Sequence, residues 1–310
     1  MSRARGEPGV DYWKLLRPKQ WVKNVFIFAP LIYSRNFFNP SLLGLAFAAF
    51  IFFSLLSSGV YVFNDICDRE RDRSHPLKCR RPVASGRVSV RVAFAYAAFL
   101  CLLSLLGSFV IRPALGMVAF CYFFLVVFYS LYLKKQVIID VMSIAAGFIL
   151  RVVAGAVAVD VEVSPWLLIC TGFLALFLAL GKRRHELHLL EVTASEHRPS
   201  LENYSFAFID QMVAVAASGT ILSYSLYTFL APTSQGLMVT IPFVVYALLR
   251  YLHIVYHQNL GGEPEEILLH DRPFQVAVVL WLVTSLLVLY FGSIPGVPVF
   301  AAIFSFCPGA

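Results

Sequence analysis

Long apolar stretches alternate with short polar segments along most of this chain. Nine stretches stand out, and most of them reach the roughly 20 apolar residues that a helix needs to cross a bilayer. The first is short, and Tyr12, Trp13 and Trp21 just before it are residue types enriched at membrane–water interfaces. The nine lie at about residues 24–36, 41–63, 88–111, 114–132, 138–159, 165–181, 207–231, 238–257 and 274–293. They predict an all-α, polytopic membrane protein with about nine transmembrane helices.

The composition leaves little room for a soluble protein. Of the 310 residues, 59% are apolar and only 14% are charged, and the mean hydropathy is +0.75. Soluble domains carry roughly 25% charged residues, so this chain cannot assemble an ordinary water-facing surface. Because the spans have no linkers between them, we expect residues 1–310 to form a single transmembrane helical domain.

The net charge of +7 is distributed unevenly along the chain. Every second polar segment between the apolar stretches, starting with the N-terminal one, is rich in lysine and arginine. These segments, 1–23, 64–87, 133–137, 182–206 and 258–273, together with the residues next to them, hold 21 of the 25 lysines and arginines. Basic residues concentrate on the cytoplasmic side of membrane proteins. We therefore expect a multi-pass plasma-membrane protein whose N-terminal interfacial segment (1–23) and two long cap loops (64–87 and 182–206) are cytoplasmic. The positive charge follows this topology and gives no reason to expect nucleic acid as a partner.

An aspartate-rich run lies at the inner end of the second stretch. If the helix continues, Asn64, Asp65, Asp68 and Asp72 fall within about 100° of arc, so that four oxygen donors face one direction. Oxygen ligands suit Mg²⁺, which binds one or two carboxylates together with substrate phosphates. The alternative is a solvated loop in which the arginines of the same run pair with the aspartates. Carboxylates at the mouth of a membrane bundle are costly, which favours the Mg²⁺ site.

The run reads NDICDRERD and matches the NDxxDxxxD pattern. It resembles the first aspartate motif of the UbiA superfamily of intramembrane prenyltransferases, and the length and number of spans also agree. The resemblance covers essentially the whole chain. It implies a UbiA-like bundle with an inward-facing polar cavity, in which Asn64, Asp65, Asp68 and Asp72 hold Mg²⁺ and, through it, a diphosphate substrate.

The chain departs from the superfamily pattern after the sixth stretch. A second acidic motif is expected there, but the sequence reads GKRRHE, with Lys182, Arg183 and Arg184. One acidic motif that faces a basic cluster suits a single metal-bound diphosphate plus a further phosphate held by lysine and arginine. The alternative for the cluster is positive charge that only sets the topology.

Three further segments narrow the resemblance. RPKQWVKN, YSLYLKK followed by Asp140, and GKRRHE together resemble the decaprenyl-phosphate phosphoribosyltransferases, a branch of the superfamily. This implies Mg²⁺-dependent transfer of 5-phosphoribose from phosphoribosyl pyrophosphate (PRPP) to a polyprenyl (decaprenyl) phosphate, with release of pyrophosphate, in cell-wall arabinan precursor synthesis. The segment 262–271 also resembles that branch, but no role follows from its residues.

Candidate site residues follow from these segments. Asp68, Asp72 and Asp140 are the catalytic candidates, with Asp140 placed to stabilise the cationic sugar or to contact its hydroxyls. Its alternative is a helix N-terminal carboxylate favoured by the macrodipole. Binding of the donor or of the lipid phosphate is expected from Lys14, Arg17, Lys23, Asn64, Asp65, Tyr129, Lys134, Lys182, Arg183 and Arg184. For the N-terminal cations the alternative is anchoring to lipid headgroups. Arg151 falls near mid-membrane, where a structural salt bridge or a backbone partner inside the bundle is expected.

Three other functions are alternatives to this one. A UbiA-type aromatic prenyltransferase using prenyl diphosphate shares the fold and the first motif, but it predicts the second acidic motif. A CDP-alcohol phosphotransferase would need a DGxxAR-type run, which the sequence lacks. A transporter or lipid-binding protein would bind the lipid phosphate without Mg²⁺-dependent turnover. The sequence leaves the polyprenyl length open, and a homo-oligomer is possible.

Overall fold

A computed structural model describes residues 8–74, 78–192, 204–230, 235–257 and 264–291. Within these ranges the chain is helical and contains no strand. Eight helices are long and apolar enough to cross a membrane. They are α3 (Pro40–Cys67), α5 (Val90–Ile111), α6 (Pro113–Leu131), α7 (Ile139–Val159), α8 (Pro165–Val192), α9 (Phe206–Leu230), α10 (Ile241–His257) and α12 (Arg272–Phe291). The predicted all-α, multi-pass fold is confirmed.

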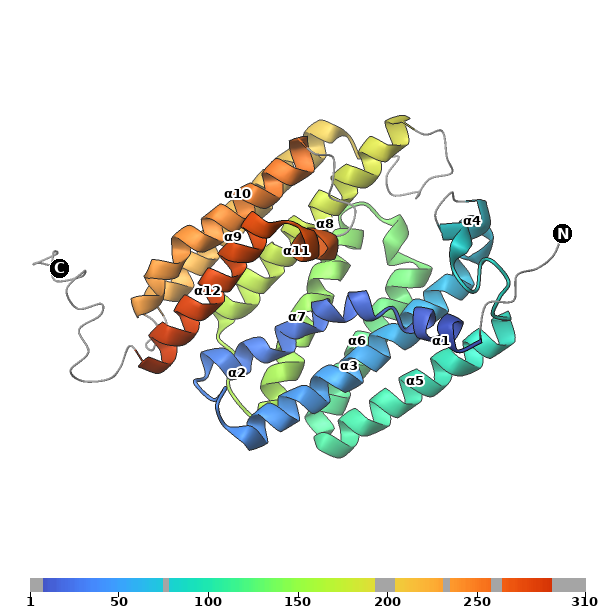
Figure 1. Ribbon diagram of the computed structural model, residues 1–310, viewed down its shortest axis with the longest axis horizontal. Coiled ribbons are helices and arrows are strands. Elements are labelled where there is room, and N and C mark those ends of the chain that lie inside the picture. Colours follow the sequence, from blue (N-terminus) through green and yellow to red (C-terminus); the bar gives the residue numbers. More distant parts are fainter. Residues whose placement is uncertain (1–7, 75–77, 193–203, 231–234, 258–263, 292–310) are drawn as a thin grey trace, which may run out of the picture.

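The first apolar stretch takes a different form from the other eight. It is a 3-10 stretch, η1 (Pro18–Phe28), that continues into the short helix α2 (Ala29–Tyr33). A 3-10 helix rises about 2.0 Å per residue, so η1 and α2 together extend roughly 30 Å, close to the thickness of the hydrocarbon core. In Figure 1 this dark-blue segment runs across the bundle beside α3 and α7. Its length therefore matches that of a span, although most of it is not α-helical.

Close approach of η1 to α7 depends on one glycine. A Cβ on Gly155 of α7 would collide with the backbone carbonyl of Ile27 in η1. Ile27 itself is fully buried in an apolar cluster that includes Ala154 and Ala158 of α7. Small residues at such contacts let helix backbones approach closely in membranes, where dispersion contacts drive packing.

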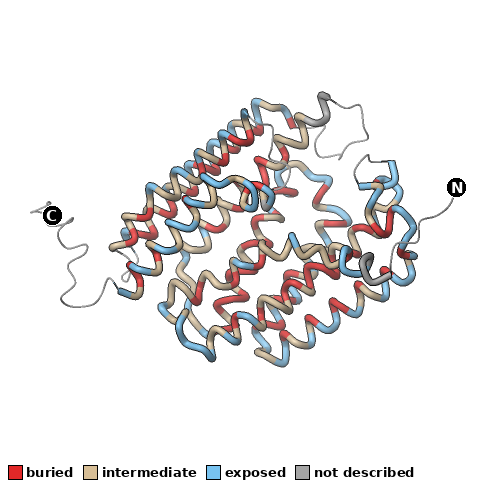
Figure 2. The backbone as a smooth tube through the Cα atoms, viewed as in Figure 1, coloured by how far each residue is buried: buried red, intermediate tan, exposed pale blue. Residues whose placement is uncertain are grey.

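Helix α7 lies between two apolar cores. One core joins η1, α3, α5 and α6 to the C-terminal half of α7. The other joins the N-terminal half of α7 to α8, α9 and α10. Of the eight spans, α7 is the most completely buried. Figure 2 shows buried positions on the facing sides of the helices and exposed positions on the perimeter. Side chains on α7 are thus held rigidly between the two halves of the bundle.

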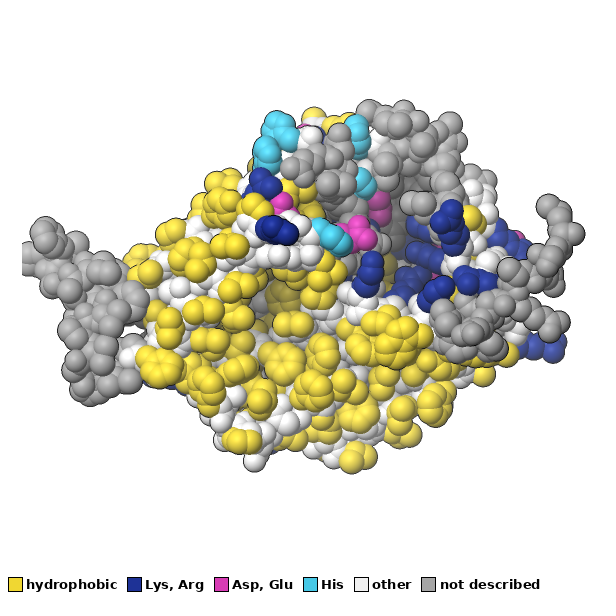
Figure 3. Space-filling model, viewed as in Figure 1, with side chains coloured by type: hydrophobic (Ala, Val, Ile, Leu, Met, Phe, Trp, Pro, Cys, Tyr) yellow, Lys and Arg dark blue, Asp and Glu magenta, His cyan; other side chains and the backbone are white. Residues whose placement is uncertain are grey.

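The perimeter is strongly apolar. Large hydrophobic side chains such as Phe94, Phe99, Leu102 and Leu106 on α5 are exposed. In the space-filling view, hydrophobic residues cover most of the visible face, whereas many of the lysines and arginines gather toward the upper right (Figure 3). An apolar belt of this kind faces lipid in a membrane protein, and the charged end then faces water.

Short elements gather at the charged end. They are α1 (Pro8–Leu16), α4 (Arg69–Ser74), η2 (Lys78–Arg80), η3 (Leu133–Lys135) and α11 (Pro264–His270). Outside this end, η5 (Gln235–Thr240) leads into α10. Trp13 is 61% exposed on α1, as expected for an interfacial residue, but Trp21 packs inward and donates its indole N–H to Ser58 at 3.0 Å. Residues 182–192 of the predicted 182–206 cap loop belong to helix α8, and residues 193–203 lie outside the described residues.

Candidate active site

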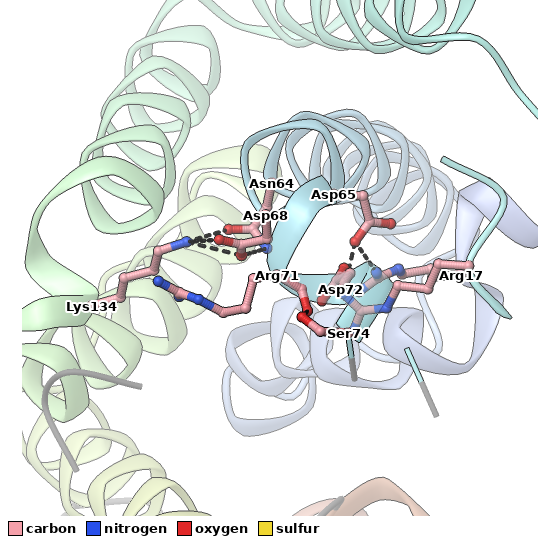
Figure 4. A network of polar contacts seen from close by, with 9 residues as sticks. Arg17, Asn64, Asp65, Asp68, Arg71, Asp72, Ser74 and Lys134 are labelled. Carbon is pink, nitrogen blue, oxygen red and sulfur yellow. Dashed lines mark hydrogen bonds and ion pairs between the residues drawn. The ribbon is translucent and has the colours of Figure 1, made fainter. Parts of the chain in front are cut away.

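The aspartate-rich run spans the junction of α3 and α4. Asp68 ends α3, and the backbone bonds from Asp68 N to Asn64 O and from Asp72 N to Asp68 O, at 2.9 and 2.8 Å, keep the helical path. At about 100° per residue, Asn64 and Asp68 form one pair and Asp65 and Asp72 a second pair, about 70° further around the axis. Figure 4 shows the two pairs on different sides of the helix. The four oxygen donors therefore stay within the predicted arc of about 100°, but they divide into two pairs that point to different sides.

Lys134 holds the first pair. Its Nζ lies 2.8 and 2.9 Å from the two carboxylate oxygens of Asp68 and 3.3 Å from Asn64 Oδ1. Asn64 Nδ2 also donates to Asp68 at 3.0 Å. The Lys134 side chain is only 6% exposed, so this ion pair is largely shielded from solvent. Lys134, a predicted substrate ligand, thus lies against the aspartate run.

Two arginines hold the second pair. Arg81 Nη1 bridges Asp65 and Asp72, at 3.0 and 2.6 Å, and Arg17 donates to Asp65 from the other side. Both carboxylates are buried. Arg17 has a φ of 51°, in the left-handed region that a non-glycine residue rarely adopts. This strained backbone turns the chain from α1 into η1 and aims the guanidinium at Asp65, and such strain persists where surrounding contacts hold it.

The donor set fits Mg²⁺. Both pairs consist of oxygen atoms without histidine or cysteine, and each pair already holds a cationic nitrogen within hydrogen-bond reach. Within the described part of the chain, no three His, Cys, Asp or Glu side chains form a group that could hold a metal ion by themselves. A metal here would need substrate phosphates and water to complete its coordination, which is the usual arrangement for Mg²⁺.

Asp140 occupies a different environment from the aspartate run. It is fully buried near the start of α7 and accepts from Arg183 Nε at 2.8 Å, from Tyr204 Oη at 3.0 Å and from its neighbour's backbone N–H at 2.8 Å. Its oxygens are committed to these partners. A carboxylate so enclosed positions other groups, and the expected direct contact with the sugar finds no support here.

Arg183 is also enclosed, contrary to the expectation of a free phosphate ligand. Its side chain is 1% exposed and pairs with Asp140 and Glu186, and its Nη2 donates to Tyr129 Oη at 3.3 Å. Tyr129, expected to bind substrate, thus lies beside this buried arginine. Charges buried this deeply require pairing, which explains why an intramembrane arginine meets two carboxylates.

A strained turn connects the buried pair to Lys134. Ile138 has a φ of 68°, which is unusual for a β-branched residue. Its backbone N–H donates to Tyr204 Oη at 2.7 Å, and Tyr204 donates to Asp140. Burial raises the pKa of Tyr204 to about 12, so this phenol keeps its proton. The series of hydrogen bonds from Arg183 through Asp140 and Tyr204 therefore fixes the turn at Ile138. This turn follows the segment in which Lys134 contacts Asp68.

The remaining basic-cluster residues are arranged separately. Arg184 donates to Asp210 of α9 at 2.8 Å, and its guanidinium lies 3.8 Å from the ring centroid of Tyr256 on α10. Tyr256 Oη donates to the same carboxylate at 2.8 Å. This arrangement ties α8, α9 and α10 together. Lys182 is half-buried on α8.

The three predicted N-terminal cations have different surroundings. Arg17 belongs to the aspartate cluster, and Lys23 on η1 donates to Gln20 at 2.5 Å. Lys14 instead lines an open depression of the surface together with Cys79, Arg80, Ser85 and Arg87. Of the three predicted N-terminal ligands, Arg17 alone contacts a carboxylate of the aspartate run.

Arg151 meets the structural expectation. It is 5% exposed inside the bundle, and it donates to Asn24 Oδ1 and to Tyr122 Oη, both at 2.7 Å. Asn24 in turn donates to Ser54 at 3.0 Å. These partners are neutral side chains, in place of the salt bridge or backbone partner expected. They join η1, α3, α6 and α7 in the membrane interior.

The segment 262–271 gains a partial role from its described residues. Asp271 accepts from Arg250 of α10 at 2.7 Å and caps α12 by accepting from the backbone N–H of Phe274 at 2.8 Å. The hydrogen bond from Arg250 lowers the pKa of Asp271 below its ordinary value. This end of the segment therefore braces α10 against α12.

Two residues of the site were not found from the sequence. Arg81 is one of seven basic residues within 64–87, and no spacing distinguishes it from the others. Tyr204 lies between the sixth and seventh apolar stretches in a polar segment without periodicity. Their contacts reach across 16 and 64 residues of the chain, which local patterns do not encode.

Comparisons with known proteins agree with this architecture. Residues 25–266 match the UbiA prenyltransferase family. The chain is 35% identical over 278 residues to the decaprenyl-phosphate phosphoribosyltransferase of Mycobacterium tuberculosis, covering 87% of this chain and 91% of that protein. It is 37% identical to that of Corynebacterium glutamicum, covering 89% and 86%.

A solved structure shares the fold. A UbiA homologue from Archaeoglobus fulgidus, bound to GPP and Mg²⁺, superposes with a TM-score of 0.70 at 20% identity, over 90% of this chain and 99% of that one. The apolar spans, the aspartate-rich run and these matches lead to one conclusion: the chain is a membrane protein of the UbiA prenyltransferase family.

Proposed function

We propose that this protein is a membrane-bound phosphoribosyltransferase that moves 5-phosphoribose from PRPP to a polyprenyl phosphate. The main support is the identity of 34–37% over most of the chain to decaprenyl-phosphate phosphoribosyltransferases. The site chemistry agrees, because one acidic cluster meets several basic side chains. A donor with a diphosphate and a separate phosphate, joined by an anionic acceptor, calls for such a surplus of cations.

Mg²⁺ is proposed at the oxygen pairs of the aspartate run. Asn64 and Asp68 form one pair, Asp65 and Asp72 the other, and the diphosphate of the donor would complete the coordination. When bound, the metal supplies positive charge that stabilises the departing pyrophosphate. Lys134, Arg17 and Arg81 now neutralise the same carboxylates and are available to contact the phosphates of the donor.

The transfer itself needs no protein base. An oxygen of the lipid phosphate, which is ionised at neutral pH, attacks the anomeric carbon. A new carbon–oxygen bond forms there while the bond from that carbon to the diphosphate oxygen breaks. Pyrophosphate leaves with that electron pair, and attack from the opposite face converts the α-donor into a β-product.

The remaining expectations complete the proposal. The active site faces the cytoplasm, where a soluble donor such as PRPP is available, and the lipid product enters arabinan precursor synthesis at the plasma membrane. Lys182 is proposed to assist donor binding. Asp140, Arg183 and Arg184 position the helices that carry the site, since their partners lie within the protein. Lys14 and Lys23 are proposed to attract the lipid phosphate electrostatically.

A single assay tests the proposed activity. Purified protein in detergent receives polyprenyl phosphate, Mg²⁺ and PRPP labelled in the ribose. We expect the label to enter the organic phase, and EDTA to prevent it. Label transfer that requires a prenyl diphosphate and an aromatic acid would instead identify an aromatic prenyltransferase. Binding of the lipid without turnover under either condition would identify a binding protein.

A further inference from the structure

We propose that Arg71 forms a subsite for the terminal phosphate monoester of the sugar donor, separate from the diphosphate site. The inference rests on the proposed function and deepens it, because it assigns the second phosphate of the donor to a particular side chain. The GKRRHE cluster was the expected location. In the structure, Arg183 is enclosed by carboxylates and Arg184 is bound to Asp210, so both arginines of this cluster have partners within the protein.

Helix geometry places Arg71 beside the first oxygen pair. Its spacing from Asn64 and Asp68 is i+7 and i+3, so it lies within about 60° of both around the axis, but about 100° from Asp72. Figure 4 shows the side chain of Arg71 directed toward the Lys134 side of the helix and away from Asp65. Arg71 and Lys134 thus approach the same side of the aspartate run from α4 and η3.

Arg71 is exposed and uncommitted. Among the residues that the structure describes, its guanidinium makes no hydrogen bond or ion pair, and only its backbone carbonyl accepts, from Ser74 Oγ at 3.1 Å. The neighbouring arginines differ. Arg73 bonds to both carboxylate oxygens of Glu70, at 3.0 and 3.1 Å, and to the Ala84 carbonyl at 3.2 Å, and Arg69 lies 3.7 Å from Glu70.

The chemistry of a guanidinium suits a phosphate monoester. Arginine presents a planar fork of donors that binds two phosphate oxygens at once and stays charged at all relevant pH values. A monoester carries nearly two negative charges at neutral pH, so it gains from a second cation such as Lys134 nearby. A diphosphate held at the oxygen pairs and a monoester held at Arg71 would orient the ribose between them.

The test removes the guanidinium of Arg71 by substitution and, separately, removes the 5-phosphate from the donor. Transfer kinetics are measured for wild type, Arg71→Ala and the matched control Arg73→Ala, with PRPP and with ribofuranosyl 1-pyrophosphate, which lacks the 5-phosphate. We expect Arg71→Ala to raise the KM for PRPP about tenfold to a hundredfold, the range for a hydrogen bond between charged groups. The same variant should leave the kinetics with the truncated donor unchanged, and Arg71→Lys should recover part of the loss.

A binding measurement separates this inference from the proposed function. Calorimetry with ribose 5-phosphate in EDTA reports on the monoester subsite without turnover or metal. Weaker binding in Arg71→Ala but not in Arg73→Ala supports the subsite even if wild type fails to use PRPP. Equal losses in both variants, or unchanged PRPP kinetics in Arg71→Ala, would overturn it, because the arginine would then contribute only general positive charge.

Discussion

Arg183 of α8 donates from Nε to Asp140 of α7 at 2.8 Å, and the two side chains are 1% and 0% exposed. Neither group can exchange its partner for water. The pair also supports Tyr204, whose hydroxyl bonds to the strained turn at Ile138 just after Lys134. Two residues expected to contact substrate thus bond to protein groups that support this turn.

This relationship predicts a stability effect for Asp140 and Arg183. Replacing one partner leaves an uncompensated buried charge, so Asp140→Ala or Arg183→Ala should each destabilise the protein by about 3–5 kcal/mol. The double variant should lose less than the sum of the single variants, because they share one interaction. Thermal unfolding in detergent gives the coupling. If the losses in unfolding free energy were strictly additive and the KM for PRPP rose only in Arg183→Ala, Arg183 would instead be a phosphate ligand.

The aspartate run is predicted to carry the activity, and its variants are expected to remain folded. Asp68→Ala and Asp72→Ala should each lower transfer by a factor of about 100 or more, as expected when transition-state charge loses its stabilisation. Both variants should remain extractable and monodisperse by size-exclusion chromatography. Glu70→Gln is the control, since Glu70 lies in the same run but its side chain is 74% exposed. Full activity in both aspartate variants would rule out the metal assignment.

Gly155 is predicted to tolerate no side chain. Because a Cβ there meets the Ile27 carbonyl, Gly155→Ala should displace η1 from α7 and cost about 1–3 kcal/mol, the usual range for overpacking. The reference is Gly44→Ala on α3, where no atom lies within 4 Å of the added Cβ. Unfolding temperatures of the two variants, measured in the same detergent, provide the comparison. Equal temperatures would show that η1 can shift freely.

The Asp271–Arg250 contact predicts a pH-dependent contribution to stability. Because the folded pKa of Asp271 is lowered, chiefly by the hydrogen bond from Arg250, the stabilisation is present above the unfolded value of 3.8. It is lost as the pH falls through the folded pKa. Wild type should therefore unfold at a higher temperature than Asp271→Asn at pH 7, and the difference should shrink below pH 4. A constant difference across this range would contradict the assignment.

Several features were predictable because they depend on local composition. Apolar runs of bilayer length predicted about nine spans, eight of which are long apolar α-helices among the described residues, and the α-helical class, since only internally bonded helices or closed barrels tolerate hydrocarbon. The spacing of Asn64, Asp65, Asp68 and Asp72 predicted a site made of oxygen donors. Their division into two pairs could not be predicted from the sequence, because it depends on contacts with Lys134 on one side and with Arg17 and Arg81 on the other.

Sequence alone thus indicated the membrane environment of this protein, its helices, its family motif and the candidate oxygen donors. Each of these follows from residues that are near one another in the chain. Tertiary structure decided which charges remain available. Asp140 and Arg183 carry the same charges as Asp68 and Lys134, but packing encloses both members of the former pair, whereas Asp68 remains 21% exposed. The physical reason is burial: an enclosed ion must keep its partner in the protein, whereas an ion at the boundary can exchange it for a substrate.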